Sequence, residues 1–436
     1  MSVLLSVSFS SISRGLLGMA VLVGIAWLCS NNRKAVNWAL VGKGLLIQLI
    51  FAVAVLKVPF IASGFNLVGK FFREIIGFTQ AGTHFLFKSF ETDAIDPALI
   101  NFVIQILPTI IFFAALTSLL YYLGILQKIV YVFAWCMKKV MNLSGAESMA
   151  AAGNIFLGQT EAPLLIRPYL KSMTKSELMC LMSGGMATIA GGVLAAYISF
   201  LGQGDPEQEL FYAKHLLAAS VMSAPAAVVA AKILVPETEK FDETLEVPKE
   251  KIGSNALEAI ANGTTDGIKL AVNVAAMLLV FIAFIAMVNY LLDDMIGQWT
   301  GLSAWVAENT KFTGFTLQFI FGYLFAPLAW LMGVCSEDIV LVGQLMGEKT
   351  IVNEFVAYLS LGKMKMASAF TEEKSVIMST YILCGFANFS SIGIQIGGIG
   401  ALIPGRKGLL SKLGIRALIG GTLACLFTAV IVGMLY

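Results

Sequence analysis

Long stretches without charge are the feature that most restricts how this chain can fold. Three of them run from Val103 to Leu126, from Ile377 to Gly405 and from Ala417 to Tyr436. As a helix rising about 1.5 Å per residue, each stretch could cross the roughly 30 Å hydrocarbon core of a bilayer. Only 13% of the 436 residues are charged, whereas a soluble domain carries about 25%. We therefore expect an all-α polytopic membrane protein.

The apolar stretches predict eight membrane-spanning helices, at residues 15–30, 37–58, 102–126, 175–203, 213–235, 266–292, 376–402 and 413–435. Basic residues follow the first, third and seventh spans, and short cytoplasmic loops are enriched in lysine and arginine. Alternation from these loops places both termini outside, in the periplasm if the cell is Gram-negative. No cleavable signal peptide is evident, so we expect a multi-pass protein of the cell (inner) membrane.

Two further apolar segments do not fit single spans, because the charge alternation fails unless each returns to the side it entered. The first runs from Ser148 to Ile166 and contains Gly158 and Pro163, and the second runs from Phe312 to Ser336. We predict a re-entrant hairpin in each segment. Non-helical backbone at membrane depth is tolerated only where protein or a water-filled cavity satisfies its polar groups. Two such hairpins indicate a transport site.

An internal similarity supports this interpretation. The segment SGGMATIAGG, from Ser183 to Gly192, resembles CGFANFSSIG, from Cys384 to Gly393, and a Lys-Ser pair precedes each. Transporters built from inverted repeats carry glycine-rich, interrupted segments at corresponding positions of their two halves. Chance similarity between two helices rich in small residues is the alternative explanation.

Two carboxylates stand out, because an ionisable side chain at the centre of a membrane helix costs roughly 2.5–3.5 kcal/mol. Glu161 and Glu354 both lie in apolar surroundings without an adjacent lysine or arginine. Each could sit near an interface or in an internal hydrogen bond. However, Gln159 and Thr160 precede the first and Asn353 precedes the second, and such clustering favours a site for a polar ligand.

Neutral polar side chains form a second group of candidates. Asn388 and Ser391 are three residues apart, which places them on one face of a helix, where they could bind a ligand or join two helices. Asn154 and Thr188 offer oxygen atoms that suit a small hard cation. The six cysteines form no CxxC pair and there are only two histidines, so a zinc cluster or a histidine-based catalytic site is disfavoured.

Four segments together resemble the signature segments of the concentrative nucleoside transporter family. They are GQTEAPLLIRPYL, SGGMATIAGGVLA, NEFVAY and LCGFANFSSIGIQIGG, and the similarity extends from about Met19 to the C-terminus. The chain looks like a bacterial member of this family. The resemblance implies a homotrimer. Each protomer would have eight transmembrane helices, two re-entrant hairpins and interfacial helices. It also implies import of nucleosides by an elevator-like motion of a transport domain against a trimer scaffold.

The resemblance also implies a role for individual residues. Those expected to face the nucleobase are Gln159, Thr160 and Glu161, with Val193 and Phe386 packed against it. Those expected to bind the ribose hydroxyls are Glu354, Asn388 and Ser391. Those expected to bind a co-transported sodium ion are the side chains of Asn154 and Thr188 and the carbonyl groups of Leu157 and Ile189.

The function that we expect is sodium-coupled import of nucleosides such as uridine. A proton-coupled relative, in which Glu161 or Glu354 takes up the proton, is the alternative within transporters. A passive pore for polar solutes is a further alternative, and an enzyme is disfavoured because no nucleophile–base set appears. The expected partners are the nucleoside, membrane lipid and two further copies of the chain, with no nucleic acid.

The domain plan that we expect follows the predicted elements. It comprises N-terminal helices that are mainly scaffold (1–145), a first transport half with the first hairpin and the following helices (146–235), a cytoplasmic loop (236–265), a scaffold helix with an interfacial helix (266–310), a second transport half with the second hairpin and a broken helix (311–412), and a C-terminal helix (413–436).

Overall fold

The computed structural model describes residues 9–87, 107–241 and 253–436, and within these ranges all regular structure is helical. By length and hydropathy, six of the described helices could cross a membrane, or seven if the bent pair formed by α5 (Leu107–Tyr122) and α6 (Ile125–Met141) is one span. The all-α membrane fold is confirmed, and the count of eight spans stays a prediction. The start of the third predicted span (102–106) and residues 242–252 of the predicted cytoplasmic loop (236–265) lie outside the described residues.

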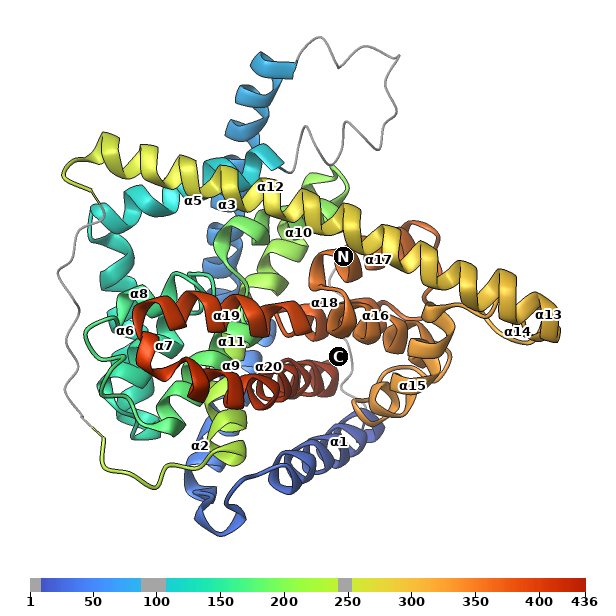
Figure 1. The fold of residues 1–436 in the computed structure, drawn as a ribbon, viewed down its shortest axis with the longest axis horizontal. Coiled ribbons are helices and arrows are strands. Elements are labelled where there is room, and N and C mark those ends of the chain that lie inside the picture. Colours follow the sequence, from blue (N-terminus) through green and yellow to red (C-terminus); the bar gives the residue numbers. More distant parts are fainter. Residues whose placement is uncertain (1–8, 88–106, 242–252) are drawn as a thin grey trace.

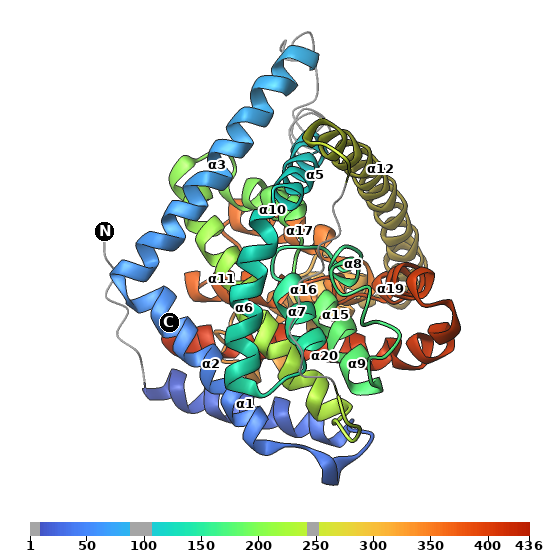
Figure 2. The ribbon, with the colours of Figure 1, turned by 90° about the vertical axis from the view of Figure 1, so that its left-hand side faces the viewer.

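The N-terminal part consists of α1 (Phe9–Leu28), α2 (Trp38–Lys57) and α3 (Pro59–Phe87), with the short 3₁₀ helix η1 (Arg33–Ala35) between the first two. The predicted spans do not include α3. This helix follows α2 after a single residue, Val58, whose extended backbone ends α2, and a proline at the first helical position starts the next helix without losing a hydrogen bond. In Figure 2, α3 and α12 (Ala256–Asn289) lie on opposite sides of the molecule.

The first hairpin forms where the sequence predicts it. Helix α7 (Gly145–Gly153) is completely buried, residues 154–161 are not helical, and α8 (Ala162–Leu165) completes the hairpin. Pro163 lies in the first turn of α8, where its missing N–H leaves no hydrogen bond unmade. A non-helical turn inside the protein is the arrangement that this apolar segment with its central polar residues indicates.

Three helices complete the first half: α9 (Lys175–Ala187), α10 (Gly191–Gly202) and α11 (Pro206–Leu234). A reciprocal capping box starts α9, since Thr174 accepts from the backbone of Glu177 and the Glu177 carboxylate accepts from the backbone of Thr174. Extended backbone at Thr188 and Ala190 separates α9 from α10. The predicted span at 175–203 is therefore a broken helix.

The second hairpin does not form where the sequence predicts it. The segment from Phe312 to Ser336 contains one helix, α15 (Leu317–Leu331), with Pro327 inside it. A two-helix hairpin forms instead between α16 (Ile339–Ile351) and α17 (Glu354–Met366), which meet at Val352 and Asn353. The prediction was wrong because charge alternation requires a chain reversal in this part of the sequence without fixing where it lies, and an apolar membrane helix tolerates Pro327.

The remaining helices of this part are η4 (Tyr290–Gly297), α13 (Gln298–Thr300), α14 (Leu302–Asn309), α18 (Glu373–Leu383), α19 (Phe389–Leu402), η5 (Pro404–Arg406) and α20 (Lys407–Leu435). The order from α15 to α20 repeats the order from α6 to α11: a helix, a two-helix hairpin, a broken helix and a long helix. The long helices α11 and α20 pack together at the centre (Figure 1). In the most apolar stretch of each helix, 89% and 83% of the residues are buried, respectively.

Helix α12 differs from these central helices. Figure 1 shows it extended along one edge of the molecule, and only 12% of the residues in its most apolar stretch are buried. Its main contact is α5, where Gly263 and Gly267 let the two backbones approach closely: a Cβ at Gly267 would lie 2.8 Å from the Cα of Ile111. Small residues four apart are a common interface between membrane helices. Most of the apolar surface of α12 is thus left uncovered in the single chain.

Candidate functional site

Glu354 opens α17 and is only 4% exposed. Asn353 caps this helix, since its side chain accepts from the backbone N–H of Val356 at 2.9 Å. Both carboxylate oxygens have donors: the Tyr197 hydroxyl donates to Oε1 at 3.0 Å, and Asn388 Nδ2 donates to Oε2 at 2.9 Å. A buried carboxylate with two neutral donors and strong acceptor capacity is suited to bind hydroxyl groups.

Asn388 occupies the break between α18 and α19. Its Oδ1 accepts from the Ser391 N–H at 2.9 Å and from the Ser390 hydroxyl at 2.7 Å, so the side chain caps α19. The same side chain uses its Nδ2 to reach Glu354. Asn388 therefore fixes the broken helix and the second hairpin relative to one another.

A glutamine from the first hairpin completes the network. Gln159 Nε2 donates to the Ser391 hydroxyl at 3.1 Å, and Gln395 Nε2 donates both to Gln159 Oε1 at 3.1 Å and to the carbonyl of Met182 at 3.0 Å. Gln395 Oε1 is buried without a hydrogen-bond partner. Polar side chains from both halves of the chain thus converge at one place in an apolar protein.

The other predicted substrate-binding residues differ in how far their side chains are exposed. Thr160 and Glu161 are exposed at the turn of the first hairpin, and the Thr160 side chain lies next to Gly398 of α19. Val193 is buried on α10, and Phe386 is half-buried in the break before α19. In the described part of the chain, no hydrogen bond joins Thr160 or Glu161 to the second half.

The predicted cation ligands lie together around the first hairpin. Asn154 ends α7 and is 1% exposed; its Oδ1 has no hydrogen-bond partner, while its Nδ2 donates to the Leu181 carbonyl at 3.4 Å. Thr188 is equally buried, and its hydroxyl donates to the Gly184 carbonyl at 2.9 Å. Because that proton is used, the oxygen lone pairs of Thr188 stay available to a cation.

The two predicted carbonyl ligands also fit a cation. Within the described residues, neither the Leu157 nor the Ile189 carbonyl accepts a hydrogen bond. Because carbonyl groups inside proteins are nearly always paired, two carbonyl groups without hydrogen bonds among the described residues are available to a ligand. Neutral oxygens of this kind suit a monovalent hard cation better than a transition metal.

The turn of the first hairpin is attached to the helices behind it. The Gly191 N–H donates to the Phe156 carbonyl at 3.2 Å, and the Ser220 hydroxyl donates to the Ile155 carbonyl at 2.8 Å. These bonds join the turn to the break before α10 and to α11. The non-helical backbone is therefore satisfied by protein at this point, as membrane depth requires.

Sequence reasoning missed two side chains of the network, Tyr197 and Gln395. Gln395 lies four residues after Ser391, and Tyr197 lies four residues after Val193. Residues four apart share a helix face, so helical spacing from the predicted residues could have found both.

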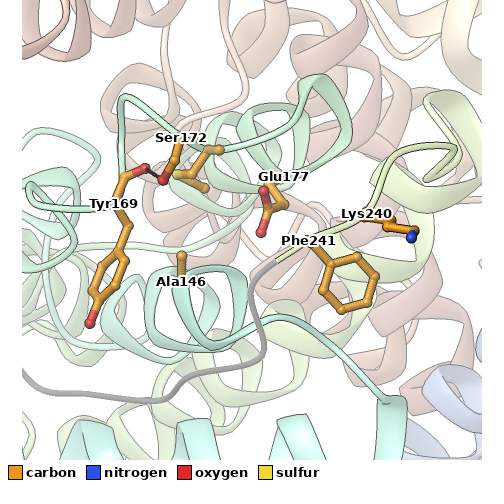
Figure 3. A pocket seen from close by; sticks show the side chains of 7 residues that line it. Ala146, Tyr169, Ser172, Glu177, Lys240 and Phe241 are labelled. Carbon is orange, nitrogen blue, oxygen red and sulfur yellow. Dashed lines mark hydrogen bonds between the residues drawn. The ribbon is translucent and has the colours of Figure 1, made fainter.

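A cavity of about 230 Å³ lies elsewhere, between α7, the chain before α9 and the chain after α11, with Tyr169, Glu177 and Phe241 in its wall (Figure 3). The Ser172 hydroxyl donates to the Tyr169 carbonyl at its edge, 3.0 Å away. None of the predicted ligand residues lines this cavity, so we do not place the site there.

Comparison with known families covers most of the chain. Residues 17–90 match the Na+ dependent nucleoside transporter N-terminus, residues 103–204 match a nucleoside recognition (Gate) domain, and residues 215–433 match the Na+ dependent nucleoside transporter C-terminus. The network described above draws its residues from the second and third of these regions.

Similar whole proteins and solved structures point to the same family as these matches. An uncharacterized transporter of Haemophilus influenzae is 43% identical over 97% of this chain and 98% of its own length. The sodium/nucleoside cotransporter 2 of Rattus norvegicus is 39% identical over 96% of this chain, which spans 62% of that longer protein.

The structure of CNTnw in an inward-facing substrate-bound state has a TM-score of 0.87 and 38% identity, with 98% of both chains covered. A variant of CNTnw in an outward-facing state has a TM-score of 0.85 and 37% identity, with 97% of both chains covered. These are transporters and not enzymes, which confirms the expected class. The chain is a multi-pass membrane protein that belongs to the Na+ dependent nucleoside transporter family.

Proposed function

We propose that this protein imports nucleosides such as uridine together with sodium, by an elevator-type movement of the two hairpins and the broken helices. The observation that carries the proposal is the hydrogen-bonded network of Gln159, Glu354, Asn388 and Ser391, because it gathers an amide, a carboxylate and a hydroxyl from two hairpins and a broken helix. Each member can exchange its present partner for a group of a nucleoside.

The chemistry of the network divides between sugar and base. Glu354 accepts two hydrogen bonds and would accept them from ribose hydroxyls, with Asn388 and Ser391 beside it. Gln159 both donates and accepts, which suits the mixed edge of a pyrimidine base. The exposed Thr160 and Glu161 would meet the base from the turn, and Val193 and Phe386 would supply apolar contact.

The proposed sodium site consists of the oxygens of Asn154, Leu157, Thr188 and Ile189. Support comes from the unpaired Asn154 Oδ1 and from the two carbonyl groups without hydrogen bonds. A sodium ion there would join the first hairpin to the break before α10, and thereby order the turn that carries Gln159. Ion and nucleoside would then raise one another's affinity reciprocally.

The energetics permit concentrative uptake. One sodium ion moving inward across 100 mV releases about 2.3 kcal/mol, and a tenfold concentration gradient adds about 1.4 kcal/mol. Together these could sustain a nucleoside gradient of about several hundredfold at one ion per nucleoside.

Assembly and topology are part of the proposal. We propose a homotrimer in the inner membrane with both termini outside. The uncovered apolar surface of α12, which is 12% buried within one protomer, supports a scaffold role for that helix. We also propose the domain divisions at 145, 235, 265, 310 and 412, which follow the elements predicted from the sequence.

The decisive experiment is uptake of radiolabelled uridine into proteoliposomes, with sodium and proton gradients imposed separately. We expect accumulation above the outside concentration only with an inward sodium gradient. Accumulation driven by the proton gradient alone would establish the proton-coupled alternative. Equilibration without accumulation under either gradient would indicate a passive pore.

A further inference from the structure

Lys349 is a buried lysine that the proposed transport site does not use. It lies in the last turn of α16, it is 3% exposed, and it is three residues before Val352, where the turn of the second hairpin begins. Its Nζ donates to the carbonyls of Ile382 at 2.8 Å and Cys384 at 3.3 Å, and lies 3.3 Å from Cys425 Sγ. Two of these partners are backbone oxygens at the end of α18.

Another buried lysine, in the first half of the chain, has different partners. Lys232 on α11 pairs with the carboxylates of Glu147 at 2.8 Å and Glu237 at 3.4 Å, as a buried cation normally does. Among the described residues, no carboxylate forms an ion pair with Lys349. The direct hydrogen-bond partners of this ammonium group are carbonyl oxygens and a sulfur atom, as around a bound metal cation, and the Glu354 carboxylate interacts with it electrostatically without forming an ion pair.

The repeat of elements gives this arrangement a counterpart. Asn154 and Lys349 both lie at the carboxyl end of the first helix of their hairpins, α7 and α16. Each reaches a carbonyl in the first segment of the following broken helix: Asn154 reaches Leu181 in α9, and Lys349 reaches Ile382 in α18. The first half thus presents oxygens to a cation, whereas the second half supplies the cation itself.

We propose that the ammonium group of Lys349 is a tethered cation, which occupies in the second half the position that the transported sodium ion occupies in the first. This inference rests on the proposed sodium site at Asn154. It deepens that proposal by fixing the coupling, since only one position is left for a free ion. The tethered charge also holds the broken end of α18 against the second hairpin permanently, so the ribose side of the site needs no ion to form.

Two variants separate a tethered cation from a merely structural contact. Lys349→Ala opens a space lined by the Ile382 and Cys384 carbonyls, into which a sodium ion can enter. Lys349→Met removes the charge but fills the space with a chain of similar length. The readout is the melting temperature of the purified protein in sodium chloride and in choline chloride of equal ionic strength, with each variant also combined with Asn154→Ala.

We expect both variants to lower the melting temperature in choline, and sodium to restore at least half of the loss in Lys349→Ala but none in Lys349→Met. The restoration should persist with Asn154→Ala, because it does not use the first site. Equal losses without a sodium effect would overturn the proposal, as would a Lys349→Met variant with parental stability and uptake.

A measurement on the parent protein needs no variant to fold. Current and uridine flux recorded together should give about one charge per nucleoside, and about two charges would overturn the inference. This result is independent of the ion's identity. A proton-driven current at the same ratio would reject sodium coupling at Asn154 and leave the tethered cation standing.

Discussion

The two halves of this chain repeat one order of helices, yet their hairpin turns differ in exposure to water and in the charged side chains beside them. In the first half the hairpin turn is long, and Thr160 and Glu161 at its end are exposed, while Asn154 offers an unpaired neutral oxygen. In the second half the turn is two residues long and buried, and the charged groups Lys349 and Glu354 flank it. A repeated framework can therefore supply an ion site in one half and a fixed polar site in the other.

The two halves should therefore differ in how they respond to ions and nucleosides. A neutral, under-satisfied set of oxygens gains hydrogen bonds or an ion only when a ligand arrives, so its order depends on the solution. A carboxylate and an ammonium group that are already hydrogen-bonded are ordered beforehand. We expect the first half to carry the ion dependence and the second half to carry the affinity for the sugar.

Accessibility of the two turns should differ most. Glu161→Cys should react with a hydrophilic thiol reagent, and nucleoside should slow the reaction, whereas Asn353→Cys should stay almost inert because Asn353 is 8% exposed. Both are measured after Cys29 and Cys136, which are exposed, are changed to serine. Equal labelling of the two positions would erase the contrast between the turns.

Removal of the charge in the second half should have the next largest effect. Glu354→Gln should weaken uridine binding by about 10- to 100-fold, because charge-assisted hydrogen bonds contribute about 1.5–3 kcal/mol. The measurement is isothermal titration calorimetry, with the exposed Glu337 changed to glutamine as the control. An unchanged uridine affinity would remove Glu354 from the ribose site.

A smaller effect, confined to sodium, is expected in the first half. Asn154→Ala and Thr188→Val should each raise the sodium concentration for half-maximal uptake by about tenfold, the loss of roughly one ligand worth 1.4 kcal/mol. Saturating sodium should partly restore nucleoside affinity, and Thr188→Ser, which keeps the hydroxyl, should resemble the parent. A sodium activation curve that neither disruptive variant shifts would contradict the assignment.

The contact between the halves should contribute least. Ser391→Ala removes the hydroxyl that accepts from Gln159, a neutral hydrogen bond worth about 1 kcal/mol, so we expect a loss of about fivefold in uridine affinity. Ser390→Ala is the matched control, because Ser390 donates only to Asn388 and has no bond to the first half. A larger loss in the control than in Ser391→Ala would place the junction elsewhere.

Local sequence was enough to predict the features that depend on local chemistry. Gly158 and Pro163 mark the first hairpin, because the backbone must turn there, and Glu354 stands out as a charge in an apolar stretch. The second hairpin was misplaced because its turn at Val352 and Asn353 contains neither glycine nor proline. The only local signal there is Asn353, which caps the start of α17, the second helix of the hairpin.

Features that depend on packing could not be predicted. The residues Tyr197, Lys349 and Gln395 acquire their partners from helices that are distant in the sequence, as the bond from Gln395 to Gln159 shows. Helix α3 was also missed: it does not qualify as an apolar span by hydropathy, and it packs against α11. Such pairings are set by tertiary contacts, which no local pattern specifies.

The bonds from Gly191 to Phe156 and from Ser220 to Ile155 have a mechanical consequence. They fasten the backbone of the first turn to α10 and α11 at two points, so this turn cannot swing outward as an independent gate without breaking them. In the proposed elevator-type mechanism, we therefore expect these two bonds to persist while the hairpins and broken helices move together.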